Sequence, residues 1–540
     1  MYKHKYYIIF LGILLAMGIS ACSSRNLSES QTSVPNIQEE QREISEQEEQ
    51  EEEVGISGQQ EYASPEAVIK EYLAGLRDND LERMLNTFDE NGCMGQVGME
   101  TAYLEEPRVQ STGMASLDFY QSITVKNYED DVVNDILRQY MILCNMEIDT
   151  QSPMSLYEDG DAEKLVKHLR ERIEATDFSS MKLLGFVSQE FLINAVGSDR
   201  YNQYMDLNAD RIGADKVESR ACIIELDGNK YVLNFETAEY EGKWLILQLG
   251  GYVASMTEID KSAAGTERLS AEEERLYEKE YEQFMVPAGD LPQAADNAEA
   301  EASANWESDG FDTPQEAVKA YLEGIKAGDM ERIISTFAVE SYVDHYDLQK
   351  NLEYTKGYIF MRQSFDLPVV NKLSREFNIR TRKRKITEEI VEQYQILCFI
   401  NGSYFGNASI TDGKGGEDIL QNQREMAQAL ELDTINILGY IPPEDLAETY
   451  TSEANREFLK QRAQWCGAEQ VAAGMVVFEL QGNKYYLCAD VIKYNGRWYN
   501  WQLGGQLASF LDIDKSFKGT CVLESLEEME IESLIVPMES

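Results

Sequence analysis

Histidine is the scarcest chemically informative residue in this sequence. Its 540 residues include only His4, His168 and His345. A zinc site or a histidine-based catalytic triad needs histidine close to carboxylates, thiols or a nucleophilic hydroxyl, and isolated histidines offer little for either chemistry. We therefore predict no metal and no other cofactor, and we assign no catalytic residue.

Cysteine and positive charge are also limited. The eight cysteines include no C-x-x-C pair, and seven remain if Cys22 is set aside, so they do not form a complete disulfide framework or a zinc ribbon. Lysine and arginine total 48 against 97 aspartates and glutamates, which gives a formal net charge of −49. Such a charge repels nucleic acid, so we predict no nucleic-acid partner.

The first 22 residues have the pattern of a targeting segment. Lys3 and Lys5 precede an apolar run over 8–17, which is too short to span a membrane, so residues 1–21 are predicted to be a signal peptide. The ending Ile-Ser-Ala-Cys at 19–22 resembles the lipobox of bacterial lipoproteins. That resemblance implies that Cys22 carries the lipid and that the protein is anchored on the extracytoplasmic face of the cell membrane. The alternative is an ordinary secretory signal followed by a chance cysteine.

An acidic segment follows. Between Glu39 and Glu53, nine of fifteen residues are glutamate. Such a run repels itself and has almost nothing to bury, so residues 22–62 are predicted to be a disordered tether.

The rest of the chain repeats itself. The passage LDGNKYVLNFETAEYEGKWLILQLGG at 226–251 returns as LQGNKYYLCADVIKYNGRWYNWQLGG at 480–505, with 13 of 26 positions identical. SPEAVIKEYLAGLRDNDLERMLNTF at 64–88 likewise returns as TPQEAVKAYLEGIKAGDMERIISTF at 313–337. We predict two complete domains, a first copy at 63–288 and a second copy at 311–540, joined by a polar linker at 289–310.

Each copy reads as helices followed by a meander of antiparallel strands. Ser64-Pro65 and Thr313-Pro314 predict helix starts, and Gly213 and Gly467 predict helix ends. Further helices are predicted over 132–144 and 388–398. In the first copy the predicted strands cover 221–226, 230–240 and 243–249, with Asp-Gly-Asn and Glu-Gly in the turns.

This order of helices, meander and terminal QLGG resembles the nuclear transport factor 2-like superfamily of cystatin-like cones, and the bacterial lipoproteins that carry such modules. The resemblance implies an α+β fold in which helices pack on a curved antiparallel sheet, twice in tandem. Some members of the superfamily catalyse proton transfer in the cone, and many others only bind. Each copy is longer than a usual module, so additional middle helices are expected.

One charged run differs between the copies. RTRKRK at 380–385 aligns with KNYEDD at 126–131, so a basic stretch replaces an acidic one. The candidate binding residues are the five cations of this run: Arg380, Arg382, Lys383, Arg384 and Lys385. They could form a solvated loop, dock on the acidic residues at 129–131, or bind an anionic polymer of the cell envelope.

Aromatic residues recur at equivalent places in the meanders. The six positions are Tyr231, Tyr240 and Trp244, with Tyr485, Tyr494 and Trp498. Cross-strand packing is the preferred interpretation, and the lining of a cavity is the alternative.

The sequence thus favours a lipid-anchored binding or interaction protein without catalytic activity, with the membrane and a cell-envelope polymer or protein as partners. The alternative is an isomerase-like enzyme that transfers protons in the cone. The binding protein of a transporter would need alternating strands and helices, which the order of elements here does not supply.

Overall fold

A computed structural model describes residues 62–88, 132–146, 161–257, 259, 264–293, 306–355, 366–400, 430–513, 518–522 and 532–538. The chain from Tyr62 onward groups as one compact unit. The predicted signal peptide, Cys22, most of the predicted tether and the acidic residues at 129–131 lie outside the described residues.

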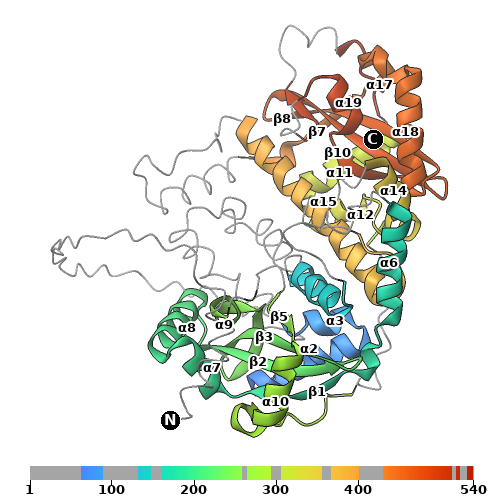
Figure 1. The fold of residues 1–540 in the computed structure, drawn as a ribbon. Helices are drawn as coiled ribbons and strands as arrows, with labels where there is room; N and C mark the ends of the chain where they lie inside the picture. The colour runs from blue at the N-terminus through green and yellow to red at the C-terminus, as the bar shows by residue number, and fades with distance from the viewer. Residues whose placement is uncertain are drawn as a thin grey trace, which may run out of the picture. The chain divides into compact units, whose positions relative to one another are not determined.

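In the first copy, helices come before, between and after the strands along the sequence. Its elements are α2 (Pro65–Asp78), α3 (Leu81–Leu85), a helix over 132–143, α6 (Ala162–Ala175), β1 (Lys182–Val187), α7 (Gln189–Val196), α8 (Ser198–Ile212), β2 (Lys216–Leu226), β3 (Asn229–Tyr240), β4 (Lys243–Leu249), α9 (Gly251–Met256), β5 (Thr266–Arg268), α10 (Ala271–Phe284) and β6 (Met285–Val286) (Figure 1).

The second copy follows the same plan. Its elements are α11 (Pro314–Ala327), α12 (Met330–Ser335), α13 (Glu340–His345), α14 (Leu348–Thr355), α15 (Lys372–Ile400), β7 (Asn436–Tyr440), α17 (Pro443–Leu446), α18 (Glu453–Cys466), β8 (Gln470–Leu480), β9 (Asn483–Tyr494), β10 (Arg497–Leu503), α19 (Gly505–Phe510) and β11 (Thr520–Val522).

Two antiparallel sheets result, with matching strand orders. The first runs β4-β3-β2-β1-β6, and the second runs β10-β9-β8-β7, with β5 and β11 each paired to the long central strand. The two-residue turns at Asp227-Gly228 and Glu241-Gly242 have positive φ at both residues, as tight hairpins require. A bulge interrupts β3–β4 after Glu236, and another interrupts β9–β10 at Asn500. Such bulges bend a strand, which fits the predicted curved sheet.

Helices cover both faces of each sheet. In the first copy, one buried cluster joins α2, α3 and the helix over 132–143 to inward residues such as Phe235, and a second joins α7 and α8 to alternate residues such as Ile223. The second copy also has Leu487 on one face and Cys488 on the other, but there Cys488 packs with α19, and the buried residues of α18 join the cluster that contains Leu487. We call the face toward α2 or α11 the inner face, and the face toward α8 or α19 the outer face. Of the additional middle helices expected from the sequence, the helix over 132–143 and α6 therefore join the inner-face cluster, and α7 and α8 cover the outer face.

The capping residues predicted from the sequence are confirmed. Ser64 accepts a hydrogen bond from the backbone of Ala67, and Thr313 forms a complete capping box with Glu316. Gly213 and Gly467 end their helices in the left-handed conformation, with φ of 65° and 63°.

Two boundaries differ from prediction by five residues or more. Strand β2 begins at Lys216, five residues before the predicted 221, and α15 begins at Lys372 where a helix was expected only from 388. The charged residues of these extensions interrupt an apolar pattern, but tertiary contacts described below hold the second extension in place.

Within the described part of the chain, none of the helices combines the length and apolar character needed to cross a membrane.

Candidate functional site

The basic run lies in the first half of α15, and its first three cations are buried. Arg380, Arg382 and Lys383 are 6%, 7% and 2% exposed. The guanidinium of Arg382 donates to the carbonyl of Ala338 at 3.0 Å and to that of Trp501 at 2.5 Å. These bonds tie α15 to β10 and to the chain after α12.

Aromatic rings complete the surroundings of these cations. The guanidinium carbon of Arg382 lies 4.9 Å from the ring centre of Tyr342, and Lys383 Nζ lies 3.0 Å from that of Trp306. A cation over an aromatic face is stabilised by the ring quadrupole, more strongly when water is excluded. The structure therefore gives Arg382 and Lys383 internal, fold-holding contacts.

Arg380, Arg384 and Lys385 also have acidic partners. Arg380 pairs with Glu82 of the first copy, Arg384 pairs with Glu388 at 2.9 Å, and Lys385 lies 3.7 Å from Asp366. The Arg380–Glu82 pair joins the second copy to the first. The docking hypothesis named the acidic residues at 129–131 as partners, and Glu82 is a different carboxylate. Arg384 and Lys385 keep 26% and 36% of their side chains exposed, so an external binding role for the run now depends on these two residues.

A polar group in the second copy was not singled out from the sequence. Glu389, one turn before Gln393 on α15, is partly buried and accepts a hydrogen bond from the backbone N–H of Leu503 at 2.8 Å. Burial raises the pKa of its carboxyl from the ordinary 4.5 to about 7, and the nearby Arg382 and Lys518 limit the rise. A glutamate one turn from an apolar stripe on a helix was the only sequence signal for this position.

The raised pKa predicts a pH-dependent stability. Because the folded state holds this proton more tightly than the unfolded chain, the stabilising contribution of protonated Glu389 is fully present below pH 4.5 and is lost as pH rises through 7. We expect Glu389→Gln, which keeps an acceptor for Leu503, to stabilise the chain at pH 8 by about 2 kcal/mol and to have little effect at pH 4.5. Urea unfolding followed by tryptophan fluorescence measures this, since three of the five tryptophans lie in the second copy and a fourth, Trp306, contacts Lys383 of α15. A difference that does not change with pH would contradict the assignment.

The repeated QLGG motif has a structural explanation on the outer face. Asp490 of β9 is fully buried and accepts hydrogen bonds from Gln502 Nε2 at 2.9 Å and from the backbone N–H of Gln506 at 3.1 Å. Nη1 of Arg462 on α18 lies 2.5 Å from Oδ2 of Asp490 and forms an ion pair with it. Gln502 of the motif donates to this buried carboxylate, and Gly505, its second glycine, has no side chain that would collide with it. Both residues are therefore needed where the motif recurs.

In the first copy, a glutamate takes the place of this buried aspartate. Glu236 is also fully buried and accepts from Gln248 Nε2 at 2.6 Å and from the backbone N–H of Tyr252. The position equivalent to Arg462 is Asn208, and burial raises the pKa of the Glu236 carboxyl. One copy thus encloses its carboxylate with an arginine, and the other has no arginine there.

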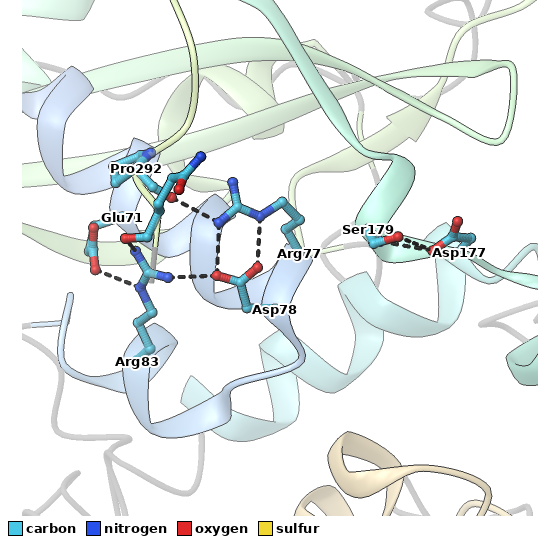
Figure 2. A network of polar contacts seen from close by, with 8 residues as sticks. Glu71, Arg77, Asp78, Arg83, Asp177, Ser179 and Pro292 are labelled. Carbon is cyan, nitrogen blue, oxygen red and sulfur yellow. Dashed lines mark hydrogen bonds and ion pairs between the residues drawn. The ribbon is translucent and has the colours of Figure 1, made fainter. Parts of the chain in front are cut away.

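A surface network in the first copy joins α2 to the segment after β6. Figure 2 shows Arg77 bonded twice to Asp78, at 2.7 and 2.8 Å, and donating to the carbonyl of Pro292 at 2.8 Å. Arg83 bridges Glu71 and Asp78 at 2.6 and 2.7 Å. The bonds from Arg77 lower the pKa of the Asp78 carboxyl. The network fastens the segment after β6 to α2, so its charges hold the chain together.

The repeated aromatic residues lie mainly in the cores. Five of the six are at most 6% exposed and belong to the clusters that contain α2 or α11: Tyr231, Trp244, Tyr485, Tyr494 and Trp498. The hydroxyl of Tyr494 also donates to the backbone carbonyl of Cys466 at the end of α18, at 2.8 Å. Tyr240 is partly buried and packs on the outer face. This placement agrees with the preferred interpretation of packing. Among the described residues, no group of three or more histidine, cysteine or carboxylate side chains is arranged to hold a metal ion.

Comparison with known proteins supports the fold. A cystatin-like protein from Ruminococcus gnavus ATCC 29149, known from a crystal structure, is similar to this chain with a TM-score of 0.51 and 14% sequence identity. The similarity covers 87% of this chain and 96% of that protein. No family model matches the sequence, and no curated protein matches it. The α+β class with helices on antiparallel sheets is thus shown, and the similarity carries no functional assignment.

Proposed function

We propose that the chain is a lipid-anchored binding protein without catalytic activity, composed of two tandem cystatin-like modules held at the extracytoplasmic face by Cys22. The observation that carries this proposal is the internal use of polar groups. Arg382, Lys383 and the Asp490–Arg462 pair all contact the protein's own backbone, rings or charges. Catalytic groups instead converge on a place that a substrate can reach.

The location rests on the sequence before the folded part. A basic start, an apolar run and Ile-Ser-Ala-Cys occur in the order that lipoprotein processing requires. The acidic tether would keep the modules away from the bilayer, because its glutamates repel one another and anionic lipid alike.

We expect Cys22→Ala to abolish membrane retention, because the acyl chains are then never attached. Fractionation of cells into membrane, cell wall and medium measures the loss, and Cys93→Ala serves as a matched cysteine control that stays in the membrane. Recovery of the Cys22→Ala protein in the washed membrane would overturn the anchor.

The same fractions report on the partner. If an anionic envelope polymer is bound, the released variant collects in the cell-wall fraction at low salt and leaves it at high salt, because exposed charges are screened over about 8–10 Å at 0.1–0.15 M. Appearance in the medium at low salt would point to a protein or small-molecule partner instead.

An enzyme that transfers protons is the second candidate, and Glu389 is the observation that favours it. A carboxyl whose pKa is about 7 can both accept and donate a proton at neutral pH. Its bond to the backbone of Leu503 equally supports a structural role, so binding remains the first proposal.

A further inference from the structure

On the inner face of the first copy, two hydrogen bonds link three buried side chains in a row. Tyr72 Oη donates to Gln139 Oε1 at 2.6 Å, and Gln139 Nε2 donates to Thr266 Oγ1 at 2.9 Å. All three side chains are at most 2% exposed. Each polar atom of the glutamine amide thus has a protein partner, as buried polar groups require.

The second copy has the same residue types at the equivalent positions, but its hydrogen bonds do not link all three side chains. Gln393 Nε2 still donates to Thr520 Oγ1, while Tyr321 Oη and Gln393 Oε1 have no hydrogen-bond partner among the described residues. Tyr321 and Gln393 are 0% and 1% exposed. A buried polar atom without a partner is energetically unfavourable. Because the equivalent atoms of the first copy meet each other, the two atoms of the second copy favour a group bound between them.

The polar atoms define the group that would fit. Gln393 Oε1 only accepts, since the amide nitrogen already donates to Thr520. Tyr321 Oη can donate, so the complement is a group that accepts one hydrogen bond and donates another. An anion is disfavoured because Gln393 Oε1 only accepts hydrogen bonds and would repel it. A cation is disfavoured because it cannot accept the hydrogen of the Tyr321 hydroxyl.

We propose that Tyr321 and Gln393 of the second copy bind one neutral hydroxyl group, which belongs either to an interior water molecule or to a small alcohol or polyol. The site uses residues that the binding function proposed above does not assign, and it does not depend on the lipid anchor. The first copy cannot bind in this way, because Tyr72 occupies the acceptor of Gln139 directly.

The test is a crystal structure of the full chain at a resolution that shows ordered water. The expected result is a density peak at hydrogen-bond distance, about 2.6–3.2 Å, from both Tyr321 Oη and Gln393 Oε1. A compact peak, with no small molecule released on denaturation, identifies water. An extended peak, with a neutral molecule detected by mass spectrometry of the denatured protein, identifies an alcohol or polyol.

Two matched variants sharpen the test. Tyr321→Phe should remove the peak, and Tyr72→Phe, the same change in the first copy, should leave it in place. The proposal is overturned if the wild-type protein shows no peak, and in particular if Tyr321 bonds directly to Gln393 as Tyr72 does to Gln139. It is equally overturned if the peak persists unchanged in Tyr321→Phe. None of these outcomes bears on membrane retention, so the anchor proposal is tested separately.

Discussion

Replacing Arg462 with asparagine, the residue at the equivalent position of the first copy, is expected to destabilise the chain by about 3–5 kcal/mol. Arg462 is 7% exposed and Asp490 is 0% exposed, so the substitution leaves a buried carboxylate without its cation. The guanidinium carbon also lies 4.0 Å from the ring centre of Trp501, and that contact is lost as well. Gln502 and the backbone of Gln506 still donate to Asp490, but neutral donors do not replace a full charge.

Urea unfolding followed by tryptophan fluorescence measures the loss. The double variant Arg462→Asn/Asp490→Asn provides the control, because it removes both charges and should recover a large part of the stability. A single variant that loses less than about 1 kcal/mol would show that the pair contributes no more than a surface ion pair. A double variant no better than Arg462→Asn would show instead that the arginine acts through packing.

Gly505→Ala is expected to cost about 3 kcal/mol or more, in the range of large, mechanism-specific losses. Gly505 has φ of +78°, and a β-carbon there would lie on the carboxylate of Asp490, far closer than unbonded atoms approach. Asp490 cannot move aside without losing Arg462 and the backbone of Gln506. The substitution therefore combines backbone strain with the loss of a buried network.

Gly496→Ala is the matched control. Gly496 has almost the same φ, +77°, but a β-carbon there meets no atom within 4 Å, so only the left-handed backbone is penalised, by about 1 kcal/mol. The first copy offers the same comparison. A β-carbon at Gly251 would collide with Glu236, and a β-carbon at Gly242 would meet no atom within 4 Å. Equal effects of the two substitutions in either copy, measured by thermal unfolding, would refute the proposed role of the motif.

Local patterns account for most of what could be predicted from the sequence. Ser64 and Thr313 mark helix starts because their side chains satisfy free backbone amides, and this needs only neighbours three residues away. The hairpins follow from Asp227-Gly228 and Glu241-Gly242, whose backbone preferences are equally local. Repetition of these signals in both copies strengthened each one.

The missed features depend on distant residues. The first half of α15 has the apolar residues Leu373, Phe377 and Ile379, but the run of cations after them interrupts the apolar pattern. Arg382 is accepted inside because Ala338 and Trp501, 44 and 119 residues away, present carbonyl groups to it. Glu389 likewise depends on Leu503, 114 residues away on β10. Spacing within one segment contains no information about such partners, so the candidate site could be named only as a charged run.

The helices on both faces of each sheet also bear on how the two halves have diverged. With both faces covered in the described part of each copy, a ligand meets helices, turns and sheet edges instead of a bare row of strand side chains. The outer helix α8 presents Tyr204 and Leu207 where α18 has Phe458 and Gln461, while the QLGG ending is identical. After duplication, the outer side chains of each half could therefore change without disturbing the framework that both inherited.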